Sequence, residues 1–337
     1  MRRMPEGTVS IRKPKAEILF QLNGTFSKMF KVGLDLGGSK IEIIALGDHG
    51  EELLRERTAT PQGDYLATIE TIARLVEAAD KSLWRHGHAL SAAMATVGVG
   101  IPGAESRSTG LIKNANSTCL IGKPLRHDLQ DRLRREVRIA NDANCFALSE
   151  ASDGAAAGAQ VVFGVFLGPG VGGGIVIAGK VLAGANAIAG EWGHNPLPGE
   201  WIDGHPPSGA PSCYCGRQGC LELYLSGPGL AADHRRVTDS DCSPQAIAER
   251  AAAGDAQCEA TLQRYEARLA RGLAQVINIL DPDVIVLGGG LSNMDRLYQN
   301  VPRLWAAHVF SDQVATKLLK HRHGDSSGVR GAAWLWP

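Results

Sequence analysis

The chain has 337 residues, 44% of them hydrophobic, and its 35 lysine and arginine residues balance 35 aspartate and glutamate residues. This is enough chain for about two domains with sizeable cores, and the balanced charge gives no net field to attract nucleic acid or an anionic membrane, so we expect neither partner. No stretch reaches the roughly 18 apolar residues of a membrane span, and we expect a globular cytoplasmic enzyme.

The first 28 residues differ from the rest of the chain. They are rich in arginine and lysine and contain no apolar run of signal-peptide length. The first clear strand begins only at Met29, so we predict that residues 1–28 are a disordered extension or that Met29 is the natural start. A helix-turn-helix arm is the competing interpretation, but 28 residues are too few for such a domain and a linker.

Short β-type runs and helical segments alternate through the first half of the chain. The glycine turn between two apolar runs predicts an antiparallel ribbon, and an apolar period of 3.6 predicts a helix after it. The expected elements are strands over 31–35 and 41–46, a helix over 64–87, a strand over 92–101, a helix over 124–136, a strand over 137–140 and a helix over 143–151.

The second half repeats this theme. It predicts a strand over 161–167, a glycine loop over 168–174, a strand over 175–177, helical structure over 244–280, and a strand over 283–287 that ends in three glycines. We therefore predict two similar α/β lobes around a cleft. Residues 29–140 with 324–337 would form the N-terminal lobe, and residues 141–323 the C-terminal lobe.

The glycine loop also satisfies the pattern Gly-x-Gly-x-x-Gly with Gly168, Gly170 and Gly173. That pattern indicates a dinucleotide-binding fold only when a helix follows the loop. Residues 175–182 instead resemble a second strand and a turn, so we predict a β-turn that binds phosphate. The chain has no Gly-x-x-x-x-Gly-Lys-Ser/Thr motif, which excludes a P-loop.

One histidine and three cysteines form the most specific pattern in the chain. His194 lies upstream of Cys213, Cys215 and Cys220, and three of the seven cysteines thus fall within eight residues. Imidazole and thiolates in a set of four are what a closed, structural zinc site requires. In a long chain without a secretory signal, clustered cysteines indicate a metal or catalysis rather than disulfides. A stray histidine beside buried thiols is the alternative.

Two acidic positions follow predicted strands. Asp35 precedes a turn containing Gly37 and Gly38, where glycines let backbone amides approach a phosphate and the carboxylate can hold magnesium through water. The alternative is a plain hairpin turn. Asp142 lies where a strand passes into a helix; it is either a helix N-cap, worth about 1 kcal/mol, or the carboxylate that accepts an alcohol proton in phosphoryl transfer.

Other polar and glycine positions fit the same chemistry. Asn116, Glu191 and Glu222 would supply the hydrogen bonds that a polyhydroxylated substrate needs. The glycines at 288–290 leave room for an adenine or ribose beside the backbone, although a loop that ends an element is an equal alternative.

Taken together, these motifs resemble the ROK family of sugar kinases, open reading frames and repressors. The resemblance covers about residues 29–337 and is carried by the segments 35–40, 141–142, 190–194 and 213–222. Within the family, the segments 114–118, 190–197 and 324–334 look like the bacterial fructokinase/mannokinase branch. The resemblance implies an α/β, actin-like (ribonuclease H-like) ATPase fold with two lobes around a central cleft.

The resemblance also implies roles for individual residues. Asp142 would be the catalytic base, and His194 would place one ring nitrogen on zinc and turn the other toward the sugar. The implied zinc ligands are His194, Cys213, Cys215 and Cys220. The implied sugar-binding residues are Gly103, Asn116, Asn141, Glu191, His194 and Glu222. The implied ATP-binding residues are Asp35, Gly37, Gly38, Ser39, Lys40, Gly170, Gly172, Gly173, Gly174 and Gly289.

The expected activity is transfer of a phosphoryl group from MgATP to the 6-hydroxyl of fructose and also mannose, by a homodimer with structural zinc. An N-acetylglucosamine or glucose kinase is the closer alternative, because one or two pocket contacts decide sugar specificity. A sugar-sensing regulator without catalysis is a more distant one. Two departures from the family pattern stand out: Ser39 replaces threonine, and Pro169 replaces threonine in the glycine loop, which removes a hydroxyl and an N–H.

Overall fold

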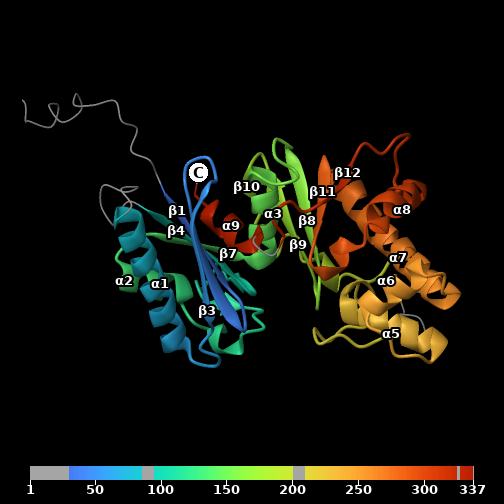
Figure 1. Ribbon diagram of the computed structural model, residues 1–337, viewed down its shortest axis with the longest axis horizontal. Coiled ribbons are helices and arrows are strands. Elements are labelled where there is room, and N and C mark those ends of the chain that lie inside the picture. The colour runs from blue at the N-terminus through green and yellow to red at the C-terminus, as the bar shows by residue number, and fades with distance from the viewer. Residues whose placement is uncertain (1–29, 86–94, 200–208, 325–326, 337) are drawn as a thin grey trace, which may run out of the picture.

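The computed structural model describes residues 30–85, 95–199, 209–324 and 327–336. The predicted extension over residues 1–28 lies outside these ranges. Figure 1 shows two α/β halves side by side, each built around a twisted sheet. None of the described helices is long and apolar enough to cross a membrane.

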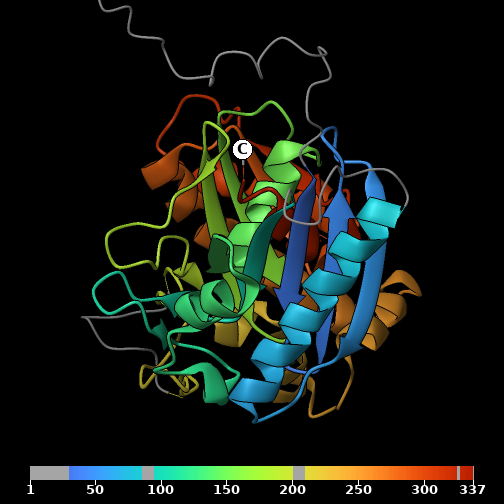
Figure 2. The same cartoon turned by 90° about the vertical axis from the view of Figure 1, so that its left-hand side faces the viewer.

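The first sheet has the strand order β3-β2-β1-β4-β7. Its strands are β1 (Lys31–Leu36), β2 (Lys40–Leu46), β3 (Glu52–Ala59), β4 (Thr96–Ile101) and β7 (Val137–Asn141). The first three pair antiparallel, whereas β4 and β7 run parallel to β1. Helices α1 (Tyr65–Arg85) and α2 (Leu125–Leu133) bury their apolar faces against one side of this sheet, as Figure 2 shows for α1.

The second sheet repeats this topology with the order β10-β9-β8-β11-β12. Its strands are β8 (Val161–Leu167), β9 (Val171–Ile177), β10 (Lys180–Val181), β11 (Val284–Gly288) and β12 (Lys317–Lys320). The outer face carries α5 (Gly227–Thr238), α6 (Pro244–Ala252), α7 (Ala256–Leu280) and α8 (Arg296–Trp305). Two smaller elements also matter for the site. They are the ribbon of β5 (Ala104–Glu105) with β6 (Ile112–Lys113) and the short helix α4 (Glu222–Leu225).

Two helices lie between the sheets. Helix α3 (Asp142–Ser152) packs on β8 and β9, α9 (Ser327–Ala333) packs on β1 and β4, and the two helices pack on each other. Their backbones touch: a Cβ atom on Gly331 would lie 1.6 Å from the carbonyl oxygen of Cys145. A fully buried Glu150 on α3 also accepts hydrogen bonds from the backbone of Arg322 and the hydroxyl of Ser327. The last helix of the described chain is therefore a structural part of both halves.

Within the described residues most predicted elements are confirmed and one is corrected, while residues 86–87 of the predicted helix and 92–94 of the predicted strand lie outside them. The glycine loop expected over 168–174 spans only 168–170, because β9 begins at Val171. The helical structure expected over 244–280 is confirmed and consists of α6 and α7, since the Asp255 side chain accepts hydrogen bonds from the N–H groups of Gln257 and Cys258 and so starts a second helix. The strands β3 and β12 and the helices α5, α8 and α9 are additional to the prediction.

Candidate active site

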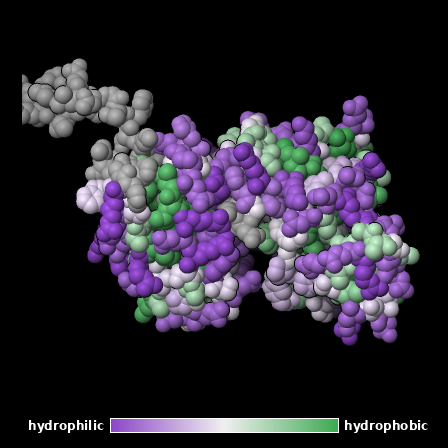
Figure 3. Space-filling view, viewed as in Figure 1, coloured by the Kyte–Doolittle hydropathy of each residue, from purple (hydrophilic) through white to green (hydrophobic). Residues whose placement is uncertain are grey.

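Asp142 lies at the junction between β7, in the first sheet, and α3, which packs on the second sheet. Figure 3 shows the surface hollowed between the two halves. Asn141 is the N-cap of α3: its side-chain oxygen accepts a hydrogen bond of 2.9 Å from the N–H of Ala143. Its amide nitrogen donates to the carbonyl of Gly103 at 3.0 Å. Asn141 thus supplies the cap, and Asp142, the first helical residue, is partly open to solvent while its Oδ1 also accepts a hydrogen bond of 2.8 Å from the N–H of Ala143.

Four carboxylates interact electrostatically at this point. Desolvation raises the pKa of Asp142, and the negative charge of Glu191 raises it further. Desolvation, with the charges of Asp142 and Glu42, raises the pKa of Asp35 to about 6. Bringing like charges together costs stability, so their proximity is better explained by a function, such as binding a cation or taking a proton, than by folding.

Replacing Asp35 by asparagine is therefore expected to stabilise the protein at neutral pH. A carboxyl whose folded-state pKa is raised binds its proton more tightly when folded, so its ionisation costs stability above pH 6 and costs nothing below its ordinary pKa of 3.8. We expect Asp35→Asn to increase the free energy of unfolding at pH 7 by about 1–3 kcal/mol, and the gain to vanish near pH 4. Denaturant unfolding at both pH values measures this.

The matched control for that substitution is Asp239→Asn. Asp239 is exposed and is the C-cap residue of α5, at a φ of 56° that asparagine tolerates. It should leave the pH dependence of stability as in the wild type. An Asp35→Asn variant no more stable than the wild type at pH 7 would show that the carboxylate of Asp35 is not destabilising.

A second group of polar side chains lies beside these carboxylates. Glu222 starts α4, and its carboxylate accepts a hydrogen bond of 3.0 Å from the N–H of Val171, the first residue of β9. Glu191 is exposed; desolvation raises its pKa, the His194 ring lowers it and Glu222 raises it. The structure thus brings Asp142, Glu191, His194 and Glu222 within electrostatic reach of one another, although they come from separate segments.

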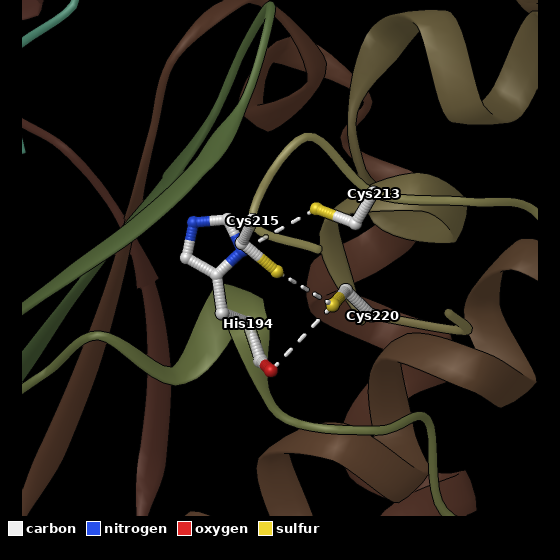
Figure 4. A group of neighbouring side chains, drawn as sticks. All are labelled: His194, Cys213, Cys215 and Cys220. Atoms are coloured by element: carbon white, nitrogen blue, oxygen red, sulfur yellow. Dashed lines mark hydrogen bonds between the residues drawn. The ribbon is translucent and has the colours of Figure 1, made fainter. Parts of the chain in front are cut away.

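The predicted metal ligands converge on one point (Figure 4). The ligand atoms of His194, Cys213, Cys215 and Cys220 all lie within 4.8 Å of one another. The Sγ atoms of Cys215 and Cys220 are 3.7 Å apart, and Nδ1 of His194 lies 3.6 Å from Sγ of Cys213. Zn–S bonds of about 2.3 Å in a tetrahedron would place sulfurs about 3.8 Å apart, so this set of donors fits zinc.

The second ring nitrogen of His194 has a partner that the sequence analysis did not foresee. The hydroxyl of Tyr214 lies 3.1 Å from Nε2 of His194, and the two rings meet edge to face with centroids 5.3 Å apart. Desolvation and the charge of Glu222 raise the pKa of Tyr214 to about 12. A tyrosine between two cysteines was visible in the sequence, but only the folded loop shows what it contacts.

The glycine turns expected to bind phosphate lie at strand ends. In the turn between β1 and β2, the carbonyl of Gly37 accepts a hydrogen bond from Thr60 at 2.7 Å, and Gly38, Ser39 and Lys40 are exposed. In the turn between β8 and β9, Gly168 accepts a hydrogen bond from the N–H of Gly227 at 2.8 Å, and Pro169 is exposed. Both turns are therefore anchored by neighbouring segments.

Several predicted glycines have a packing reason. A Cβ atom on Gly174 would lie 2.4 Å from the carbonyl oxygen of Ala143, and one on Gly173 would lie 2.7 Å from that of Gly190. A Cβ atom on Gly172, in the same strand, would lie 3.3 Å from the Cβ atom of Ala143. Close contact of β9 with α3 accounts for Gly172 and Gly174, and the nearby Gly190 carbonyl accounts for Gly173. A nucleotide contact of Gly170, Gly172, Gly173 and Gly174 stays a prediction.

Gly103 and Gly289 adopt backbone conformations that favour glycine. Gly103 has a φ of 80°, and a Cβ atom there would lie 2.4 Å from the carbonyl oxygen of Lys113. Gly289 has a φ of 81° and lies against Leu167, at the end of β8. Gly103 thus fixes the loop that leads to Asn116, and Gly289 lies next to the turn between β8 and β9.

Asn116 lies on the first half, where it lines a cavity of about 220 Å³. The cavity is also lined by Gly38 of the β1–β2 turn and by Gln62. Beside it, the Lys113 ammonium group reaches the other half and donates a hydrogen bond of 2.7 Å to the carbonyl of Asn186. This contact between the halves is a second feature that the sequence analysis missed, because no local pattern indicates it.

Comparison with known proteins agrees with this geometry. The ROK family model matches residues 31–337. An N-acetyl-D-glucosamine kinase of Vibrio cholerae is 42% identical over 306 residues, which cover 90% of this chain and 98% of that protein. The enzyme of the same name from Pasteurella multocida is 41% identical over 308 residues, covering 91% and 99%.

Solved structures share the architecture. A ROK hexokinase from Thermus thermophilus superposes with a TM-score of 0.77 at 29% identity, covering 91% of this chain and 97% of that one. A ROK glucokinase from Streptomyces griseus, solved with glucose and AMPPNP, gives a TM-score of 0.68 at 26% identity, covering 90% and 98%. These matches confirm the predicted α/β, actin-like (ribonuclease H-like) fold.

Proposed function

The chain belongs to the ROK family and is an ATP-dependent sugar kinase, and we propose that its substrate is N-acetyl-D-glucosamine, phosphorylated at the 6-hydroxyl. The observation that carries this proposal is the near full-length similarity to N-acetyl-D-glucosamine kinases. These relatives do not support the fructokinase/mannokinase branch predicted from the sequence. They favour the alternative that the sequence analysis kept open.

In the proposed reaction, Asp142 is the general base. Its carboxylate takes the proton from the 6-hydroxyl while that oxygen attacks the γ-phosphorus of MgATP, the bond to the β-phosphate breaks, and ADP leaves. The raised pKa of Asp142, which follows from desolvation, suits a group that must hold a proton briefly at neutral pH. Asp35, whose carboxylate interacts electrostatically with that of Asp142, would hold the Mg²⁺ that enters with ATP.

The remaining predicted residues bind the two substrates. We assign the sugar to Gly103, Asn116, Asn141, Glu191, His194 and Glu222. Asn141 has both ends of its amide engaged with protein, so its part includes holding the Gly103 loop in place. The nucleotide is assigned to Asp35, Gly37, Gly38, Ser39, Lys40, Gly170 and Gly289. Gly172, Gly173 and Gly174 support the turn between β8 and β9 by allowing close packing of β9.

We also propose that the four converging ligands hold a structural zinc ion. When bound, zinc would supply a closed four-ligand crosslink and no open coordination position. Bound zinc would fix the orientation of the His194 ring. It would also hold Cys220, which lies two residues before Glu222 in the chain. The homodimer and the cytoplasmic location stay predictions.

A coupled ADP-release assay tests the sugar specificity. We expect kcat/KM for N-acetyl-D-glucosamine to exceed that for glucose, fructose and mannose by at least about tenfold, which corresponds to 1.4 kcal/mol of discrimination. A preference for fructose would restore the first prediction and overturn the present one. Sugar binding without turnover on any of the four would instead support the regulator alternative.

A further inference from the structure

The turn between β8 and β9, which is proposed to bind the nucleotide, is held by the starts of helices α4 and α5. At the beginning of the turn, the carbonyl of Gly168 accepts a hydrogen bond of 2.8 Å from the N–H of Gly227. At its end, the N–H of Val171 donates to Oε2 of Glu222 at 3.0 Å. Within the turn, the N–H of Gly168 donates to the carbonyl of Gly170 at 3.0 Å. Both ends of the turn are therefore fixed to one neighbouring segment of the chain.

That neighbouring segment packs closely on the turn and is itself anchored. A Cβ atom on Gly170 would lie 2.7 Å from Oε2 of Glu222, so the carboxylate lies directly against the turn. The buried side chain of Ser226 caps the N-terminus of α5. The hydroxyl of the buried Tyr265 donates to the carbonyl of Leu225 at 3.0 Å. A displacement of Glu222 would consequently be passed to the turn.

The carboxylate of Glu222 has a second oxygen that can bind the sugar. Oε2 accepts the hydrogen bond from Val171, and among the described residues no donor lies within hydrogen-bond distance of Oε1. Glu222 is half-buried, and its charge acts on Glu191, another proposed sugar-binding residue. Because the two oxygens belong to one rigid group, a sugar hydroxyl that donates to Oε1 would fix the position of Oε2 as well. The nucleotide turn would then be fixed by the bound sugar.

We propose that Glu222 and Gly227 are positioning residues for the nucleotide turn, and that Glu222 couples this turn to the sugar: Oε1 accepts from a sugar hydroxyl while Oε2 holds the N–H of Val171. Each substrate then binds more tightly when the other is present, because coupling between two sites is reciprocal. The inference rests on the proposed sugar-kinase function and deepens it. It gives Glu222 a role beyond sugar binding, and it gives a role to Gly227, which no sequence motif indicated.

Calorimetry tests the coupling. The Kd for MgAMPPNP, a non-hydrolysable analogue of MgATP, would be measured without sugar and with a saturating amount of the sugar that the wild type phosphorylates best. We expect the sugar to lower this Kd about fivefold or more in the wild type. In Glu222→Ala, at its own saturating sugar concentration, the two Kd values should be nearly equal. The same ratio of Kd values in both proteins, or no effect of sugar in the wild type, would overturn the inference.

Gly227→Pro tests the other anchor of the turn. Proline suits the first position of a helix, and Ser226 already has the extended backbone, with φ −76° and ψ 166°, that a residue before proline requires. The substitution removes the N–H that donates to Gly168 and places a ring carbon in its direction. We expect the KM for ATP to rise about threefold to tenfold, as the loss of one hydrogen bond implies. The sugar Kd without nucleotide and the zinc content should stay within about twofold of wild type.

The matched control is Ala256→Pro, which places proline at the exposed first residue of α7, after Asp255 in an extended conformation. It should keep the wild-type KM for ATP. An unchanged KM for ATP in Gly227→Pro, or an equal weakening of sugar binding in that variant, would contradict the positioning role. Because the sugar is chosen by wild-type turnover, failure of the N-acetyl-D-glucosamine assignment would show in the specificity assay and not in these measurements.

Discussion

Asp142→Asn is expected to lower kcat by about three orders of magnitude while the Kd for the sugar stays within a fewfold of wild type. The amide cannot accept the proton of the 6-hydroxyl, and general-base catalysis typically contributes 10²–10⁴-fold. Its oxygen can still accept the hydrogen bond from the N–H of Ala143, so α3 should begin as before. Steady-state ADP release and calorimetric sugar binding measure the two quantities.

The control again is Asp239→Asn, an equal chemical change at an exposed helix end. It should keep both kcat and the sugar Kd. Turnover near wild type in Asp142→Asn would mean that another group takes the proton, and the mechanism would be wrong. A large loss of sugar affinity with kcat preserved would also contradict it, because the carboxylate would then bind the substrate rather than deprotonate it.

Cys220→Ser is expected to abolish zinc binding and to weaken sugar binding by more than tenfold. Cys220 is 1% exposed and its Sγ lies 3.7 Å from that of Cys215. Its replacement therefore removes a buried thiolate and leaves only three of the four zinc ligands. Structural zinc sites contribute on the order of 10 kcal/mol to local folding. The segment that would loosen carries His194 and leads into Glu222, two proposed sugar-binding residues. Metal analysis, limited proteolysis and calorimetry should report these changes together.

Cys242→Ser is the matched control, since Cys242 is a half-buried cysteine outside the cluster. It should retain one zinc per chain and the wild-type sugar Kd. The zinc proposal fails if purified wild-type protein holds no zinc. Full sugar affinity after removal of the metal by a chelator would show that the crosslink does not organise the sugar site.

The sequence predicted the two ribbons and Asp142 because their signals are local. Glycine turns separate short apolar runs, and Asp142 sits at a strand-to-helix junction. Strand β3 was not predicted because Arg55, Glu56 and Arg57 make its sequence polar. It forms because it pairs along β2, and because Arg55 and Arg57 neutralise Glu42, which is 1% exposed. Such cross-strand partners cannot be read from one segment alone.

Long-range contacts also explain the misplaced glycine loop. Three consecutive glycines favour a turn on local grounds, yet Gly173 and Gly174 are buried in β9. Gly174 is needed because α3 lies directly on that strand, and Gly173 is needed because the carbonyl of Gly190 and the ring of Phe163 lie against it. The relatives do not support the predicted fructose preference, and the reason is related: a few contacts decide sugar specificity, and motif spacing does not report them.

The backbone contact at Gly331 limits how the two halves can move. Helix α3 begins at Asp142, and α9 begins beside Asp35, since a Cβ atom on Gly328 would lie 3.5 Å from the Asp35 carboxylate. A swing of one half about this crossing would carry the peripheral loops, including those of Lys113 and Tyr214, through long arcs. The spacing of the two carboxylates next to the axis would scarcely change. Opening to admit substrates would therefore leave the reacting centre assembled.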